Sequence, residues 1–252
     1  MRNLLLTISY NGSGYCGFQV QQNGVTVAER VQDAIERITG IRSDIKGCSR
    51  TDSGVHANMF CINFHTDTPL SCHRMRRALD AVLPEDISAV SVEEVPDDFH
   101  ARYSCVAKRY IYKIWNAPAK SPFYHNLALH YPRRLDTELL NQAASCFVGT
   151  HNFAGFCSTG SNVTDTVRTI YDCTVSRNED LVTISITGSG FLYNMVRIIV
   201  GTLLDINEGK IPPDSLPGII DSCDRNKAGP TARPYGLYLD KVYYQLPEEF
   251  SK

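Results

Sequence analysis

The segment Cys48–His56 (CSRTDSGVH) gathers the residue types needed for acid, base or nucleophilic chemistry in one short stretch. It holds a carboxylate at Asp52, a guanidinium at Arg50 and several hydroxyls around Gly54. A stretch this polar suits a functional loop better than a core. Taken alone, however, the pattern favours a simple turn in which the Asp52 side chain hydrogen-bonds the backbone near Gly54. A functional reading therefore needs support from the rest of the chain.

That support is a resemblance that extends along the sequence. Ser49–Ala57 (SRTDSGVHA) closely resembles the signature of the tRNA pseudouridine synthase A family, in which the Asp of R-T-D-x-G-V-H is catalytic. Five further blocks resemble that family's other motifs in the same order: Ser9–Tyr15 with Gly17–Gln19, Lys108–Tyr112, Gly149–Phe153, Gly190–Gly201, and Ala228–Ala232 with Gly236–Leu239. One R-T-D tripeptide would carry no weight, whereas six ordered blocks are highly specific.

The resemblance implies one reaction, the isomerisation of uridine to pseudouridine in tRNA. The C1′–N1 bond breaks, the uracil turns, and C5 joins C1′, so the reaction needs no metal and no cofactor. By resemblance Asp52 is the catalytic carboxylate. Two roles for it stay open: covalent attack on C1′, or removal of a sugar proton to give a glycal.

Arg197 is the candidate ion-pair partner of Asp52, because the corresponding Arg of the family faces the catalytic Asp. Burial opposes ionisation of a carboxylate, and a fixed cation restores it. The alternative is a solvent-exposed helix arginine. Apolar neighbours surround Arg197 in Met195–Val200 (MVRIIV), and a lone Arg in so apolar a helix usually needs a partner.

Tyr110 is the candidate ring on which the extruded uracil stacks, from the match to the family's R-Y-x-Y strand. The alternative is a strand-core aromatic. Period-two spacing places Tyr110, Tyr112 and Ile114 on one face of a strand, and only Tyr110 is singled out by the motif. Arg50 is the candidate that supports extrusion of the base.

The expected partner is tRNA, and the family acts on its anticodon stem-loop, typically at positions 38, 39 and 40. The stretch Phe99, His100, Ala101, Arg102, Tyr103 resembles a tRNA-contacting segment of the family. Further basic pairs and triplets are scattered along the chain, and together they favour one basic surface with salt-dependent binding. The family also implies a homodimer.

Some positions depart from the family pattern. Asn11 and Asn152 replace the more usual Asp, Ser49 stands where Gly is common, and Arg233 and Tyr235 alter the closing stretch. These changes put target choice in doubt more than reaction type. The alternatives are an isomerase for another RNA, a non-catalytic tRNA-binding protein, and a hydrolase with Asp52 as nucleophile, although the last lacks an oxyanion-hole pattern.

Composition excludes several classes of protein. The chain has 252 residues, 43% of them hydrophobic, and a formal charge of −2, which excludes a uniformly basic nucleic-acid coat. No apolar run approaches the length of a membrane span, and no signal region is evident. Nine cysteines without a CxxC pair indicate reduced thiols in a cytoplasmic protein rather than disulfides or a zinc ribbon. The histidines lack metal-ligand spacing, so no metal site is expected.

The elements that must position these residues follow from periodicity and capping signals. In the first half we expect strands at 3–10, 59–65 and 87–95, with helices after Thr26 and Ser71. In the second half we expect strands at 106–115, 168–176, 181–187 and 237–244, with helices at 136–147, 193–206 and 214–223. We predict an α+β fold of two similar halves, 1–105 and 106–252, and the family implies one mixed, mainly antiparallel sheet with helices and a central active-site cleft.

Overall fold

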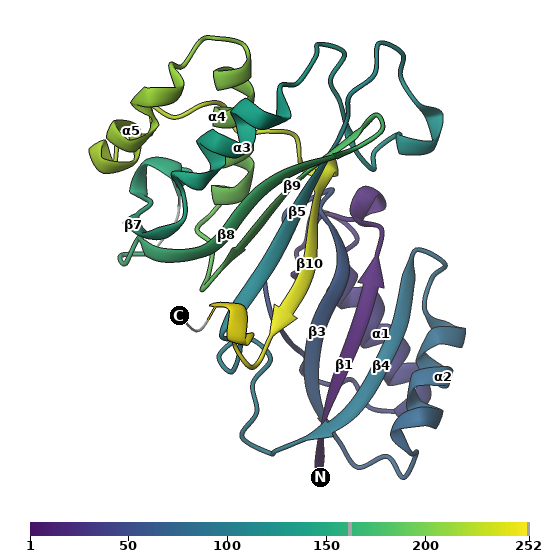
Figure 1. Ribbon diagram of the computed structural model, residues 1–252. Coiled ribbons are helices and arrows are strands. Elements are labelled where there is room, and N and C mark those ends of the chain that lie inside the picture. The colour runs from purple at the N-terminus through teal and green to yellow at the C-terminus, as the bar shows by residue number, and fades with distance from the viewer. Residues whose placement is uncertain (161–162, 251–252) are drawn as a thin grey trace. The chain divides into compact units, whose positions relative to one another are not determined.

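The computed structural model describes residues 1–160 and 163–250, and the chain divides into two compact units (Figure 1). The first unit comprises residues 1–106 and 238–246. The second comprises residues 107–237 together with the residues from Pro247 onward. A strand near the end of the chain therefore completes the unit that contains the N-terminus.

The first unit is a mixed sheet with strand order β4-β1-β3-β10, and the short β2 pairs with β3. Its strands are β1 (Arg2–Tyr10), β2 (Lys46–Gly47), β3 (His56–Thr66), β4 (Ile87–Val95) and β10 (Leu237–Tyr243). Strand β1 is antiparallel to both β3 and β4, whereas β10 runs parallel to β3. The alternation seen in the sequence is real, because Leu4, Leu6 and Ile8 are fully buried.

Helices α1 (Val27–Thr39) and α2 (Cys72–Val82) pack beside each other and cover this sheet (Figure 1). The predicted caps are confirmed. The Thr26 hydroxyl accepts a hydrogen bond from the Glu29 N–H, and Gly40 ends α1 in the left-handed conformation at φ 76°. The Ser71 hydroxyl caps α2 in the same way by accepting from the Arg74 N–H.

The second unit has strand order β5-β9-β8-β7, with the short β6 parallel to β5. Its elements are β5 (Ala107–Trp115), β6 (Leu129–His130), α3 (Thr137–Ser145), β7 (Gly149–Asn152), β8 (Val167–Asn178), β9 (Leu181–Gly188), α4 (Met195–Asn207) and α5 (Leu216–Ser222). Helix α3 packs on β8 and beside α4 (Figure 1). Most of α4 is buried, as its apolar sequence predicts.

The α+β prediction is confirmed, with mainly antiparallel strands, a parallel pairing in each unit and helices against the strands. Strands β6 and β7, of two and four residues, were not predicted, because runs this short carry no periodicity. Within the described ranges, none of the helices has the length and apolar character that crossing a membrane requires.

A buried pair of amides ties the loop after β4 to the first unit's sheet. Asn3 and Asn63, each 2% exposed, lie diagonally across β1 and β3, where Asn3 is opposite His65 and Asn63 is opposite Leu5. The Asn63 amide donates to Asn3 Oδ1 at 3.0 Å. The Asn3 amide donates to the carbonyl oxygens of Pro96 and Phe99, at 2.9 and 3.0 Å. Asn63 Oδ1 accepts from the Ala101 N–H at 2.8 Å. This network fixes the backbone of residues 96–101.

We expect Asn63→Ala to lower the free energy of unfolding by about 2–4 kcal/mol, because it leaves several buried polar groups without partners. The matched control is Asn58→Ala on the same strand, where the exposed side chain donates to the Asp240 carboxylate, and we expect it to cost under about 1 kcal/mol. Urea denaturation of both variants measures the difference. Equal losses at the two positions would contradict this role of the network.

Candidate active site

Asp52 lies in a tight turn between β2 and β3 of the first unit. The Val55 N–H donates to the Asp52 carbonyl oxygen at 3.2 Å, and Gly54 takes the positive φ of 77° that the turn requires. Main-chain atoms thus close the turn that carries the Asp52 side chain. The side chain of Asp52 is half-buried, and that of Arg50 is exposed.

Residues 9–19, called here the opening block, contact the Asp52 loop and hold it in place. The Phe18 N–H donates to the Thr51 carbonyl oxygen at 3.1 Å, and the hydroxyls of Tyr10 and Thr51 are 2.8 Å apart. The Tyr15 carbonyl oxygen accepts from the Gly54 N–H and from the Ser53 hydroxyl, both at 3.3 Å. Residues 10–18 thus fix the residues on both sides of Asp52, although the two segments lie far apart in the sequence.

Two glycines of the opening block explain why it can approach so closely. A Cβ atom on Gly12 would lie 1.9 Å from the Val55 carbonyl oxygen. A Cβ atom on Gly17 would lie 2.5 Å from the Thr51 carbonyl oxygen, and Gly17 also has a positive φ of 83°. No side chain fits at either position, so the backbones meet only where both residues are glycine.

His56 is a structural residue of the loop. Its Nδ1 atom accepts a hydrogen bond from the Gly12 N–H at 3.0 Å, and the ring is fully buried. The ring stacks on Tyr238 of β10, with centroids 4.5 Å apart and an interplanar angle of 23°. The histidine therefore joins the opening block, the Asp52 loop and β10 within the first unit.

Tyr15 anchors the opening block at its other end. Its hydroxyl donates to the Asp86 carboxylate at 2.5 Å. Burial, followed by that hydrogen bond and the charge of Asp86, raises the pKa of the Tyr15 phenol well above its usual value. The phenol accordingly stays neutral and remains a hydrogen-bond donor throughout the physiological range.

Arg197 lies in the first turn of α4, in the second unit, and is half-buried. Its Nε donates to the Ala232 carbonyl oxygen and its Nη1 donates to Asn194 Oδ1, both at 2.7 Å. The Ala232 N–H in turn donates to the Arg197 carbonyl oxygen at 3.0 Å. These bonds contradict the alternative of a solvent-exposed helix arginine. The sequence did not single out Asn194, which falls at an unspecified position of the family motif.

Residues 228–239, called here the closing block, approach α4 as closely as the opening block approaches the Asp52 loop. A Cβ atom on Gly201 would lie 1.7 Å from the Pro230 carbonyl oxygen. The Gly229 N–H donates to the Thr202 hydroxyl at 2.9 Å, and that hydroxyl donates to the Ile198 carbonyl oxygen at 2.8 Å. This contact places the Ala232 carbonyl where Arg197 reaches it.

Tyr110 lies on β5 of the second unit and is 7% exposed. Its ring meets Phe191 edge to face, with centroids 5.1 Å apart and an interplanar angle of 82°. Tyr112 is the strand-core aromatic that the alternative described: it is fully buried, its hydroxyl donates to the Arg233 carbonyl oxygen at 2.8 Å, and burial raises the pKa of its phenol.

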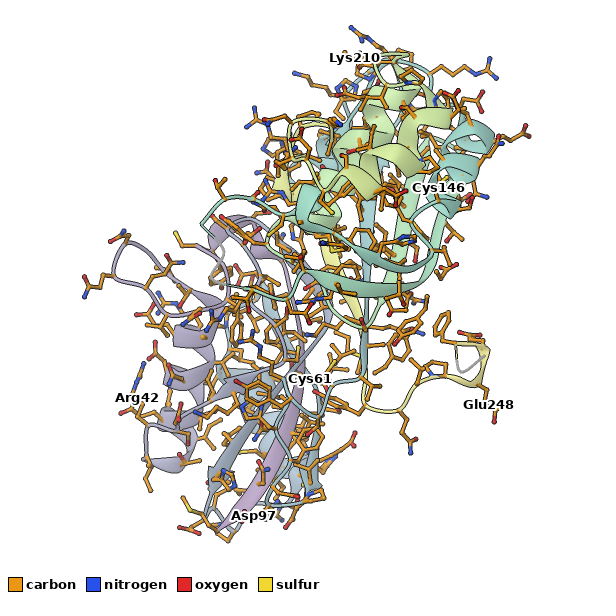
Figure 2. The ribbon with its side chains drawn as sticks, turned by 90° about the vertical axis from the view of Figure 1, so that its left-hand side faces the viewer. Arg42, Cys61, Asp97, Cys146, Lys210 and Glu248 are labelled. Atoms are coloured by element: carbon orange, nitrogen blue, oxygen red, sulfur yellow. The ribbon has the colours of Figure 1, made fainter. Side chains whose placement is uncertain are left out.

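The proposed RNA-contacting stretch, residues 99–103, is an anchored loop of the first unit. Ala101 is fully buried and bound by Asn63, and the Phe99 ring packs against Tyr244 at 4.8 Å. His100 Nδ1 accepts from the Arg102 N–H at 3.1 Å, and the Tyr103 ring packs on the His100 ring at 4.4 Å. Arg102 and Tyr103 point away from the core, and Tyr103 is 79% exposed. Figure 2 labels the exposed Asp97, just before this stretch, and the buried Cys61 of β3.

Two of the departures from the family pattern keep the hydrogen bonds that an Asp would accept. Asn11 Oδ1 accepts from the N–H and the hydroxyl of Ser13, at 3.0 and 2.7 Å. Asn152 Oδ1 accepts from the Ala154 N–H at 3.1 Å and from the Thr166 hydroxyl at 2.7 Å. In both cases the amide oxygen does what a carboxylate oxygen would do, without its charge.

The site residues thus fall into two sets. The first unit holds Asp52, Arg50 and residues 99–103, and the second unit holds Tyr110 and Arg197. Each set is fixed by a glycine-containing block that the sequence singled out only by resemblance. Sequence reasoning missed three structurally important amide side chains, those of Asn3, Asn63 and Asn194, because no periodic pattern marks a single asparagine.

We expect Gly12→Ala to displace the Asp52 loop and to lower the free energy of unfolding by more than about 3 kcal/mol, because the added methyl group overlaps the Val55 carbonyl. Gly14→Ala is the matched control two residues away, where a Cβ atom meets nothing within 4 Å. Thermal unfolding of both variants tests this. A Gly12→Ala protein as stable as Gly14→Ala would show that the close approach is not required.

Comparison with known proteins identifies the family. The family described as tRNA pseudouridine synthase matches residues 6–104 and 143–245. The chain is 47% identical over 244 residues to a protein named tRNA pseudouridine synthase A from Thermoanaerobacter sp. (strain X514), covering 97% of this chain and 100% of that one. Proteins of the same name from Clostridium acetobutylicum and Acetivibrio thermocellus are each 46% identical, with the same coverage.

A solved Cbf5-Nop10-Gar1 complex is a far more distant neighbour, with 11% identity and a TM-score of 0.37 over 79% of this chain and 43% of that one. The weight of the comparison therefore rests on the sequence matches, which run from the opening block to the closing block. By those matches, the chain belongs to the tRNA pseudouridine synthase family.

Proposed function

We propose that this protein converts uridine into pseudouridine in the anticodon stem-loop of tRNA, typically at positions 38, 39 and 40, with Asp52 as its catalytic residue. The observation that carries the proposal is the Asp52 turn, a half-buried carboxylate whose flanking residues are held by main-chain contacts that only glycine permits. Family membership supplies the substrate class. A rigid carboxylate suits a reaction whose reacting carbon belongs to a bound ribose.

The reaction balances without a co-reactant. The C1′–N1 bond of the uridine breaks, the uracil turns, the C1′–C5 bond forms, and the hydrogen on C5 leaves as a proton while N1 gains one. Asp52 either attacks C1′ or takes a proton from the sugar, and both routes need it ionised. In this proposal the Arg197 guanidinium is the cation that keeps Asp52 ionised in a partly dry site.

Tyr110 and Arg50 handle the base in this proposal. The face of the Tyr110 ring stacks on the extruded uracil, and its edge-to-face packing on Phe191 supports that orientation of the ring. Arg50 is exposed on the loop beside Asp52 and assists extrusion of the nucleotide. The protein acts in the cytoplasm and as a homodimer, in line with the family it belongs to.

Release of tritium from tRNA transcripts labelled at uridine C5 tests the reaction, because joining the base through C5 must expel that hydrogen. We expect release by the wild-type protein and a loss of at least about 10³-fold in Asp52→Asn, which keeps the shape of the side chain and removes its charge. Wild-type activity in Asp52→Asn would overturn the assignment.

The same assay separates the alternatives. Salt-sensitive tRNA binding without tritium release by the wild type would favour a non-catalytic binding protein. Release from another RNA, but not from the anticodon stem-loop, would favour an isomerase with a different target. Mapping the modified sites in RNA from cells that lack the protein identifies that target.

The exposed pair Arg102 and Tyr103 gives a second test, on RNA binding. We expect Arg102→Ala to weaken tRNA binding and to reduce the slope of log Kd against log salt by about 1, because one phosphate contact is lost. Tyr103→Ala should weaken binding with the slope unchanged, because a stacking contact releases no counterions. Arg37→Ala, an exposed arginine on α1, is the control. Equal effects of Arg37→Ala and Arg102→Ala would remove the special role of the loop.

A further inference from the structure

We propose that Asn194 is a positioning residue for Arg197, and that it orients the guanidinium without neutralising its charge. This inference rests on the catalytic role of Arg197 in the proposed function. It concerns a residue that no sequence signal marked, and it comes from the hydrogen bonds at the start of α4.

Asn194 occupies the N-cap position of α4 but does not cap the helix. N-cap residues are usually extended, and their side chains accept a hydrogen bond from the second or third N–H of the helix. Asn194 instead has the left-handed backbone conformation, at φ 62° and ψ 7°, and its side chain makes no capping bond. A strained backbone and a lost cap both cost stability, and such costs gather at functional positions.

The Asn194 side chain points at Arg197 instead. Its Oδ1 accepts from Arg197 Nη1 at 2.7 Å, while its Nδ2 donates to the Ser158 hydroxyl at 3.0 Å. The second bond fixes which end of the amide faces the guanidinium, because a reversed amide would set two N–H donors against each other. Ser158 is itself fixed, since its N–H donates to the carbonyl oxygen of Tyr193, the residue before Asn194.

With the bond from Nε to the Ala232 carbonyl, the guanidinium is held at two separate nitrogens. Two bonds to a rigid, planar group set both its plane and its rotation. The acceptors at Nε and Nη1 are both neutral, one a backbone carbonyl and the other a side-chain amide. A carboxylate at position 194 would hold Arg197 as firmly but would pair with its charge, leaving less of it to act on a second carboxylate. The neutral amide therefore fits a cation whose charge is needed elsewhere.

The experiment is a double-mutant cycle on Asn194 and Arg197, measured as kcat and KM in the tritium-release assay. Asn194→Gly removes the acceptor while keeping a residue that tolerates the left-handed backbone. We expect kcat to fall by about 10- to 100-fold with little change in KM or in the melting temperature. Asn126→Gly is the matched control, since Asn126 is an exposed asparagine of the same unit with a φ of 57°. It should leave kcat unchanged.

In an Arg197→Lys background, Asn194→Gly should cost less than about 2-fold, because the group that it orients has gone. Equal costs in both backgrounds would mean a purely structural role and would overturn the inference. Asn194→Asp should also lower kcat, although it keeps an acceptor oxygen. Full activity of Asn194→Asp would overturn the argument from charge.

Ser158→Ala keeps the proposal testable if Asn194→Gly fails to fold. It should lower kcat by a smaller factor and have no further effect in the Arg197→Lys background. The results also separate this inference from the proposed function. Wild-type activity of Arg197→Ala would overturn the proposed role of Arg197 itself, whereas an impaired Arg197→Ala beside a fully active Asn194→Gly would overturn only the role of Asn194.

Discussion

The approach of one backbone to another, with no side chain between them, is the constraint on which the Asp52 loop depends. Gly12 and Gly17 bring the opening block against the carbonyl oxygens of Val55 and Thr51, one on each side of Asp52. The same contact brings the Gly12 N–H to the buried ring of His56. A loop rich in polar groups would otherwise be mobile, and ordering it costs conformational entropy. The opening block offsets that cost with main-chain hydrogen bonds, and a further main-chain bond to the Asp52 carbonyl oxygen closes the turn.

In the second unit, a close backbone contact likewise helps to hold a functional side chain, the Arg197 guanidinium. A half-buried arginine loses part of its hydration, so its N–H groups need hydrogen-bond acceptors within the protein. Arg197 donates to the Ala232 carbonyl oxygen and to the Asn194 amide oxygen, and the close contact between Gly201 and Pro230 holds the segment that carries that carbonyl. These two acceptors are neutral, so they hold the guanidinium without cancelling its positive charge. A Cβ atom at position 201 would therefore displace the Ala232 carbonyl that accepts from Arg197, although Gly201 lies one helical turn beyond Arg197 on α4.

Sequence reasoning succeeded where local rules decide the structure. Alternation located β1, β4 and β5, and the capping signals at Thr26 and Ser71 located the starts of α1 and α2. It could not place residues 238–246 in the first unit, because the parallel pairing of β10 with β3 joins segments about 180 residues apart and leaves no local trace. The buried amides of Asn3 and Asn63 were missed for the same reason. The resemblance marked Asp52 and Arg197 as site residues, and the geometry shows how each is held.

The choice of amide over carboxylate recurs beyond Asn194. Asn11 and Asn152 both stand where Asp is usual in the family, and both keep the acceptor bonds of the loops they organise. The two Asn residues spare the chain two negative charges relative to that pattern. A chain with a formal charge of −2 has no general attraction for a polyanion, so local fields must supply it. An amide in place of a carboxylate keeps the geometry of a turn and removes a repulsion that phosphates nearby would feel. On this argument, an asparagine at each of these two positions removes a negative charge that would repel the phosphates of a tRNA substrate.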